Sequence, residues 1–219
     1  MATGVFIPFC NGKGTLSITK VFIESIRKEL ANEKEEKPKR RDQAKSREDR
    51  IVPLKKNEVW SMDLVSNALF TGAKIRILSI IDAYTRKSSA IGVRMSYKGR
   101  GVVNTLKKAA QKHSIPKFLR VDNGPEFISK DLDLWAYTHH VTLDFSRSGK
   151  PTDHAFIESF NSRFRQECLN EHWFLSLKDA RYKIMGWLRD YNSHRPHSSL
   201  GYKTPEESAA FKAIPAEVF

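Results

Sequence analysis

The sequence predicts an α/β domain that begins near residue 57 and contains a five-stranded mixed sheet flanked by helices. Two observations predict it. Three short segments rich in β-branched and aromatic residues come first, and two more then alternate with stretches of helical periodicity. With 219 residues, of which 40% are hydrophobic, the chain is long enough to bury one well-formed core.

The elements follow one another as three strands in a meander and then helix, strand, helix, strand. The predicted strands are 59–65, 75–81, 88–93, 117–121 and 141–145. The predicted helices are 99–113, 127–139, 155–169 and 177–192. In the third helix Phe156, Phe160 and Phe164 recur every four residues, which predicts a core-facing stripe, and Asp153 is placed to cap its start.

Residues 1–56 differ from the rest of the chain. Residues 18–30 have the apolar spacing of an amphipathic helix, and residues 33–56 are dominated by mixed charge. We interpret 1–56 as a helix and a charged linker that form an extended basic arm, with a truncated DNA-binding region as one alternative. Residues 57–219 are then the principal domain with its C-terminal helices.

Charge and composition narrow the class of protein. The formal net charge of +13 predicts a surface that attracts polyanions, of which nucleic acid is the commonest. Two cysteines are too few for a disulfide framework and have no zinc-ligand spacing, which fits a reducing cytosol. No apolar stretch approaches the roughly 20 residues that span a bilayer, so we expect a cytoplasmic protein without a membrane partner.

Three carboxylates are the candidate catalytic groups. Asp63 lies inside an apolar run, Asp122 ends a predicted strand, and Glu158 lies in the first turns of a predicted helix. Taken singly, each aspartate has an alternative role in a turn or a helix cap. Glu158 has an alternative role as a solvated helix residue. Together, three acids from separate elements suit Mg²⁺, which prefers oxygen ligands and catalyses phosphodiester displacement in pairs of ions.

Four segments around these residues carry a family resemblance. They are Trp60-Ser61-Met62-Asp63, the segment 121–127 (VDNGPEF), the segment 149–161 (GKPTDHAFIESFN) and the segment 191–201 (YNSHRPHSSLG). These segments closely resemble the catalytic core of bacterial insertion-sequence transposases of the OrfB type, which are related to retroviral integrases. The resemblance covers about residues 57–208.

The resemblance implies a ribonuclease-H-like fold and a DDE triad of Asp63, Asp122 and Glu158. It implies that these acids bind two divalent ions, Mg²⁺ or Mn²⁺, and that the chain cleaves DNA and transfers strands during transposition. The implied partners are DNA of the transposon ends and the target, further copies of the chain on that DNA, and an upstream-frame protein of the OrfA type. Two alternatives stay open: a nuclease of the same fold, and an inactive truncated DNA-binding remnant.

Three basic residues are candidate DNA contacts, and two residues are expected to shape a turn. Arg165, two helical turns after Glu158, is a candidate DNA contact, as are Lys150 and Arg163; the alternative for Arg165 is an ordinary exposed arginine. Asn123 and Gly124 are expected to shape a turn beside Asp122 through left-handed backbone geometry.

Other acids and the terminal motif receive structural roles. Glu126 is interpreted as a helix-start carboxylate or a DNA-proximal group, and Asp82 as a turn residue. The terminal motif contains Tyr191, Asn192, Arg195, Pro196 and His197. Its Arg and His are expected either to touch DNA or to fix the last helix, and the structural role is favoured.

Overall fold

The computed structural model describes residues 51–146 and 155–211. The strands are β1 (Val59–Ala68), β2 (Lys74–Asp82), β3 (Ser88–Arg94), β4 (Phe118–Val121) and β5 (Thr142–Phe145). The helices are α2 (Gly99–Lys112), α3 (Lys130–Thr138), α4 (Ala155–Phe164), α5 (Leu177–Ser193) and α6 (Pro205–Phe211), with a π-helical turn η3 (Arg165–Leu169) and a 3₁₀ turn η4 (Ser198–Leu200). The predicted order of strands and helices is confirmed within these residues.

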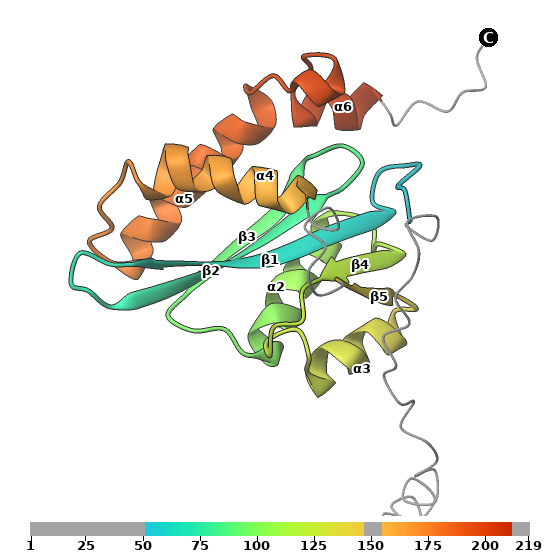
Figure 1. Ribbon diagram of the computed structural model, residues 1–219, viewed down its shortest axis with the longest axis horizontal. Helices are drawn as coiled ribbons and strands as arrows, with labels where there is room; N and C mark the ends of the chain where they lie inside the picture. The colour runs from blue at the N-terminus through green and yellow to red at the C-terminus, as the bar shows by residue number, and fades with distance from the viewer. Residues whose placement is uncertain (1–50, 147–154, 212–219) are drawn as a thin grey trace, which may run out of the picture. The chain divides into compact units, whose positions relative to one another are not determined.

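The five strands form one mixed sheet in the order β3-β2-β1-β4-β5 (Figure 1). β1, β2 and β3 are an antiparallel meander, and β1 pairs with β4, and β4 with β5, in parallel. Parallel neighbours need a crossover connection, and here α2 and α3 lie in the connections that lead into β4 and β5. The predicted five-stranded mixed sheet is therefore confirmed.

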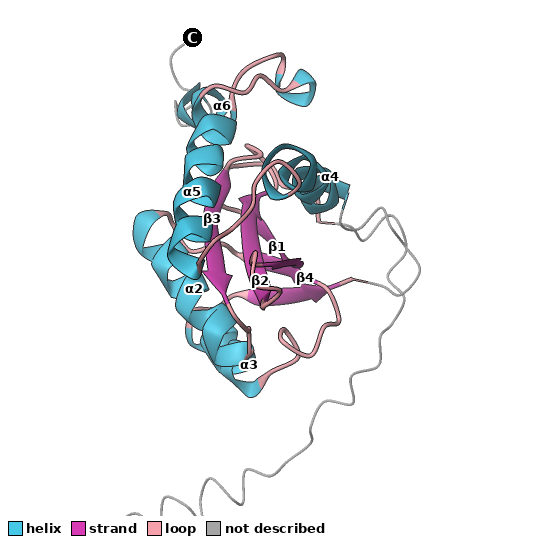
Figure 2. Cartoon of the chain, turned by 90° about the vertical axis from the view of Figure 1, so that its left-hand side faces the viewer, coloured by secondary structure: helices cyan, strands magenta, loops and turns pink. Residues whose placement is uncertain are grey.

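Each face of the sheet has its own hydrophobic cluster, because successive strand side chains point to opposite faces. On β1, Trp60 and Met62 belong to the cluster completed by α2 and α3, whereas Val65 belongs to the cluster completed by α4 and α5. Figure 2 shows the strands with α2 and α3 on one side and α4 on another. The helix α4 is thereby held against the face of β1 that carries the odd-numbered residues.

Two helices differ from the prediction in detail. The helix predicted at 127–139 begins only at Lys130, because the hydroxyl of Ser129 accepts a hydrogen bond from the Leu132 amide and caps the first turn. Its Leu134 and Tyr137 are exposed. The helix predicted at 155–169 is α-helical to Phe164 and then continues as the π-helical turn η3.

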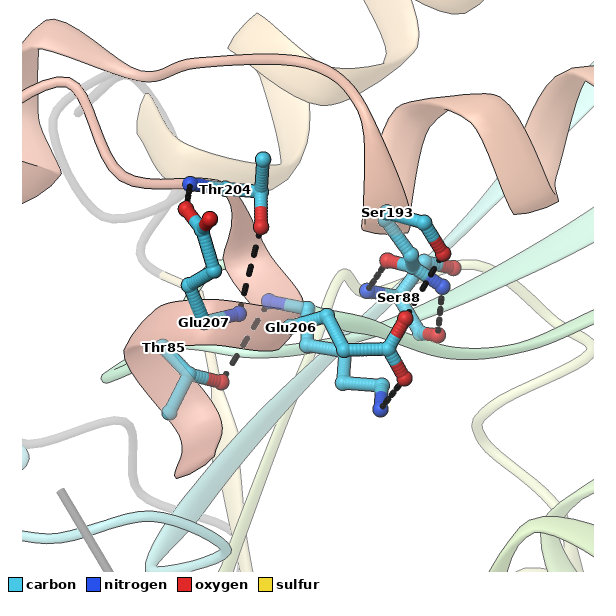
Figure 3. Close-up of polar contacts among 8 residues, drawn as sticks. Thr85, Ser88, Ser193, Thr204, Glu206 and Glu207 are labelled. Atoms are coloured by element: carbon cyan, nitrogen blue, oxygen red, sulfur yellow. Dashed lines mark hydrogen bonds and ion pairs between the residues drawn. The ribbon is translucent and has the colours of Figure 1, made fainter. Parts of the chain in front are cut away.

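The C-terminal helices are tied to the β2–β3 turn by polar contacts (Figure 3). The amide side chain of Asn192 bonds both backbone groups of Ser88, at 3.0 and 3.1 Å. Glu206 accepts from Lys87 Nζ at 3.0 Å and from Ser193 Oγ at 2.6 Å. Thr204 and Glu207 cap α6 reciprocally, each bonding the other's backbone N–H. The segment after α5 is therefore fixed to the domain.

Several predictions fall outside the described residues. These are the helix at 18–30, most of the linker at 33–56, the cap Asp153 and the loop residue Lys150. The division of the chain near residue 56 stays a prediction. Within the two described ranges, no helix has the length and apolarity needed to cross a membrane.

Candidate active site

The register between β1 and β4 places two of the three predicted acids level with each other. The parallel pairs are Val59 with Phe118, Trp60 with Leu119 and Ser61 with Arg120. Two positions further along both strands come Asp63 and Asp122. β4 ends at Val121, so β1 continues past the point where its neighbour stops.

Asp63 is held in place by a helix that is distant in sequence. Its Oδ2 accepts a 2.6 Å hydrogen bond from Asn161 Nδ2 on α4, and its Oδ1 accepts from the Leu64 amide at 2.7 Å. Asn161 is buried, and its Oδ1 accepts from Ser79 Oγ on β2 at 3.0 Å. Ser79 is the β2 partner of Asp63 in the sheet. The chain Ser79–Asn161–Asp63 therefore connects two strands and a helix at one carboxylate.

Glu158 lies on the same helix, three residues before Asn161. Residues three apart on a helix are neighbours on one face, so Glu158 lies one turn from the residue that contacts Asp63. Its side chain is exposed. Among the described residues no three His, Cys, Asp or Glu side chains are grouped closely enough to hold a metal ion. The structure thus relates the three acids by strand register and helix face, without a closed cluster of three among the described residues.

The loop after β4 is organised around Asp122. Its Oδ1 accepts a 2.9 Å hydrogen bond from the Gly124 amide, and Asn123 Nδ2 donates to the Ser146 carbonyl at 2.8 Å. Neither Asn123 nor Gly124 has a positive φ, so the expected left-handed geometry is wrong. Gly124 is required for space instead, because a Cβ there would lie 2.9 Å from Asp122 Oδ1 and 3.1 Å from Glu126 Oε2.

Glu126 closes this loop from the other side. Its Oε1 forms a 2.6 Å ion pair with Arg76 Nη2 on β2. It begins no helix, since α3 starts at Lys130. Glu126 connects the loop of Asp122 to β2 through this ion pair. The expected role as a helix-start carboxylate is wrong.

A buried arginine on β4, two residues before Asp122, forms an ion pair with β5. Arg120 on β4 is 3% exposed, and its Nε donates to Asp144 Oδ2 on β5 at 2.9 Å. Its Nη2 also donates to the Ile51 carbonyl at 3.3 Å. A buried cation needs such partners, because an unpaired charge in the interior is costly. The pair joins β4 to β5 next to the loop of Asp122.

The predicted DNA contacts fall in different places. Arg163, in the last turn of α4, and Arg165, which begins η3, are both exposed. Neither makes a hydrogen bond or ion pair with another described residue. Lys150 lies outside the described residues. The positive charge of Arg163 helps to lower the pKa of Glu167, and the role of both arginines in DNA binding stays a prediction.

Asp82 and the terminal motif have structural roles. The Asp82 carboxylate is buried and accepts from the Thr85 amide and hydroxyl at 3.1 and 2.5 Å, which confirms the expected turn role.

Arg195 of the terminal motif forms an ion pair with Glu167 of η3. Burial alone would raise the pKa of Glu167, but hydrogen bonds from Arg195 and Trp187 lower it. Together with the Asn192 contacts, this pair supports the structural reading of the motif.

Asn161 is the principal residue that the sequence-based prediction missed. Its spacing of three residues after Glu158 was a usable signal, since that spacing places both on one helix face. Its contact with Asp63 depends on how α4 packs across the sheet, which spacing alone does not specify.

Comparison with known proteins gives the class of this domain. Two family models described as "Integrase core domain" match residues 53–151 and 139–205. Among solved structures, the HTLV-2 integrase catalytic core domain in complex with magnesium superposes with a TM-score of 0.55 at 17% identity, covering 71% of this chain and 98% of that one. The simian T-cell lymphotropic virus intasome gives a TM-score of 0.64 at 15% identity, with 75% of this chain and 57% of that chain covered. The fold is the ribonuclease-H-like fold of integrase catalytic cores.

Relatives in sequence narrow the class further. An uncharacterized 31.7 kDa protein of insertion element IS407 from Burkholderia multivorans is 48% identical over 164 residues, which cover 75% of this chain and 59% of that protein. A 39.2 kDa protein of IS476 from Xanthomonas euvesicatoria is 42% identical over 185 residues, covering 83% and 54%. Transposase InsF of IS3A from Escherichia coli is 26% identical over 156 residues, covering 69% and 53%.

The chain belongs to the integrase core domain family, in the group of proteins encoded by bacterial insertion sequences. It spans little more than half the length of these relatives.

Proposed function

We propose that this chain is the catalytic core of a DDE transposase that cleaves DNA at the ends of an insertion sequence and joins the freed ends to target DNA. The observation that carries the proposal is the parallel register of β1 and β4: the last pair is Ser61 with Arg120, and Asp63 and Asp122 each follow two residues later, which supports a common site where β4 ends. The position of Glu158 one turn from Asn161, the hydrogen-bond partner of Asp63, supports the third member.

The donor set fits divalent cations. Asp63, Asp122 and Glu158 would hold Mg²⁺ or Mn²⁺, since carboxylate oxygens are the ligands that these hard ions prefer. Two such ions, when bound, activate the attacking hydroxyl and stabilise the leaving oxygen of an in-line displacement. Because no three such side chains are grouped closely enough among the described residues, we propose that the three acids close around the ions when metal and DNA are bound.

The protein's own groups position the reactants. Asn161 fixes one oxygen of Asp63, and the bond between the Gly124 amide and Asp122 Oδ1 fixes the second carboxylate. Exposed Arg163 and Arg165, and Lys150, which lies outside the described residues, are proposed to contact the phosphates of the bound DNA. Water attacks in the cleavage step and leaves a 3′-hydroxyl, which then attacks a phosphodiester of the target. Positioning and charge neutralisation are the protein's main contributions to such a transfer.

The proposed partners follow from this reaction. Joining two ends to one target requires two active sites, so we propose that several copies assemble on the two ends. An upstream-frame protein of the OrfA type is proposed to supply recognition of the end sequence.

Three substitutions test the function. Asp63→Asn, Asp122→Asn and Glu158→Gln should each abolish Mg²⁺- or Mn²⁺-dependent cleavage of a duplex that carries the element's terminal repeat, because a lost metal ligand removes several kcal/mol of transition-state stabilisation. Glu171→Gln, an exposed acid with no described hydrogen bond, is the control and should stay active. A pre-cleaved end tests joining: transfer to a second duplex supports the transposase, and hydrolysis alone indicates a nuclease. An active Glu158→Gln protein contradicts the triad.

A further inference from the structure

A pocket of about 320 Å³ lies beside α4, on the face next to the one that carries Glu158. It is bounded by the turn after β2, by α4 and by the segment that follows α5. Its lining includes Arg86, Phe156, Ser159, Arg163, His197 and Ser198. The terminal motif therefore forms one wall of a cavity, in addition to its structural contacts.

Two guanidinium groups face this pocket without a carboxylate partner. Arg86 donates to the Ala83 carbonyl and stacks on the Phe156 ring, with its Cζ 3.2 Å from the ring centroid. Arg163 is exposed and makes no hydrogen bond or ion pair with any other described residue. By contrast, Arg195, close to the same pocket, is neutralised by Glu167. Asp82 acts on Arg86, and Arg163 acts on Glu167, through charge alone, so neither guanidinium forms an ion pair with a carboxylate of the described residues.

Among the described residues, the pocket lining includes no acid. Burial lowers the pKa of Arg86, and burial together with the positive charges of Arg163, Arg195 and Arg86 lowers the pKa of His197. The exposed Ser159 and Ser198 add hydroxyl groups that can donate to an anion. The described pocket wall carries positive groups and donors, and an anion bound there would accept charge-assisted hydrogen bonds from them.

The position of the pocket indicates which anion it takes. Ser159 directly follows Glu158, and Arg163 lies one turn further along α4, so one helix carries both the proposed catalytic acid and the pocket wall. A DNA strand whose reacting phosphate lies at Asp63 and Glu158 has other backbone phosphates close by.

We propose that the pocket binds a backbone phosphate of the DNA strand engaged by the active site, with Arg86 and Arg163 as its charged contacts. This inference rests on the proposed function, because it takes DNA as the substrate. The arginines position the strand through phosphate, so they contribute affinity without sequence specificity.

Charge removal tests the pocket. Arg163→Gln and Arg86→Gln are compared with Arg100→Gln, which removes the same charge from an exposed position at the start of α2, against the opposite face of the sheet. Affinity for a labelled 30-base-pair duplex is measured by fluorescence anisotropy in EDTA over a range of KCl concentrations. Each pocket variant should weaken binding and reduce the slope of log affinity against log salt by about one, whatever the DNA sequence. Arg163→Lys should keep the slope.

A second measurement needs no substitution, in case Arg86→Gln fails to fold. The ring resonances of His197 are followed by NMR in the full chain while the duplex or inorganic phosphate is added, with His113, on the α2 side of the sheet, as the internal control. The proposal expects the His197 signals to move and the His113 signals to stay. If the His197 signals move when inorganic phosphate is added but not when the duplex is added, the assignment to a DNA phosphate is contradicted.

The two proposals fail separately. If Arg163→Gln matches Arg100→Gln in affinity and slope while the chain still cleaves DNA, the pocket assignment is wrong and the proposed function stands. If the pocket variants behave as expected but no metal-dependent cleavage or joining is found, the pocket assignment stands and the catalytic function is wrong.

Discussion

Asn161 Nδ2 donates a 2.6 Å hydrogen bond to Asp63 Oδ2, across 98 positions of sequence. The bond connects α4 to β1 and fixes the orientation of one carboxylate at the proposed metal site. Because Asn161 is itself held by Ser79, the carboxylate oxygen has a defined direction before any ligand arrives. Residues that hydrogen-bond to a metal ligand commonly tune the affinity of the site for its metal.

Asn161→Ala is expected to raise the Mg²⁺ concentration for half-maximal cleavage and to lower activity by about 10- to 100-fold, since Asp63 loses its orienting donor. Cleavage is measured as a function of Mg²⁺ concentration, alongside the thermal midpoint. Asn104→Ala, at an exposed position of α2, is the matched control and should show neither effect. If Asn161→Ala only lowers the midpoint and leaves the Mg²⁺ dependence unchanged, its role is structural alone.

Gly124→Ala is expected to reduce cleavage strongly with little loss of stability. The added Cβ would lie 2.9 Å from Asp122 Oδ1, so the carboxylate must move, while the atoms nearest to the Cβ are the ends of polar side chains and not core atoms. Activity and urea unfolding are measured on the same preparation. Gly186→Ala in α5 has no atom within 4 Å of the new Cβ and is the control, with full activity and up to about 1 kcal/mol of added stability. Full activity in Gly124→Ala would show that Asp122 tolerates displacement.

The strands were predictable because each reads as a short run of β-branched and aromatic residues, as in Ile75 to Ile81. The three acids could be proposed as a site from sequence because Asp63 lies in an apolar run, Asp122 follows a strand and Glu158 lies near the start of a helix; their role stays a prediction. The start of α3 was placed three residues early because Phe127 is apolar; it packs in the core from a turn, and Ser129 sets the helix start.

The parts of the site that sequence missed depend on distant contacts. Asn161 meets Asp63, and Arg76 meets Glu126, only after α4 and β2 have packed. Gly124 was expected to relieve backbone strain, but the space it leaves for two carboxylates is visible only in three dimensions. The pocket of Arg86 and Arg163 likewise joins residues from separate elements.

Arg120→Met is expected to lower the free energy of unfolding by about 3 kcal/mol, because Asp144 is left partly buried without its partner. Chemical denaturation at neutral pH measures the loss. Arg120→Met combined with Asp144→Leu should recover much of it, since no unpaired charge remains. A loss of less than about 0.5 kcal/mol in the single variant would mean that solvent or movement compensates the charge.

Glu167 should make stability depend on acid pH. Its pKa is lowered in the folded chain from an ordinary value of 4.5, so its contribution is present above that value and is lost as pH falls through the folded pKa. Glu167→Gln should therefore be less stable than the natural chain at neutral pH, and the difference should shrink below about pH 4. Thermal midpoints from pH 7 to pH 3 measure this, and a constant difference across the range would contradict the assignment.

The most direct measurement is the position of Mn²⁺ in a crystal of the chain bound to a DNA end, located by anomalous scattering. The account predicts metal between the carboxylates of Asp63 and Asp122, with Glu158 drawn in as a ligand. Metal bound away from this pair, or Glu158 still remote from a metal that the two aspartates hold, would contradict it.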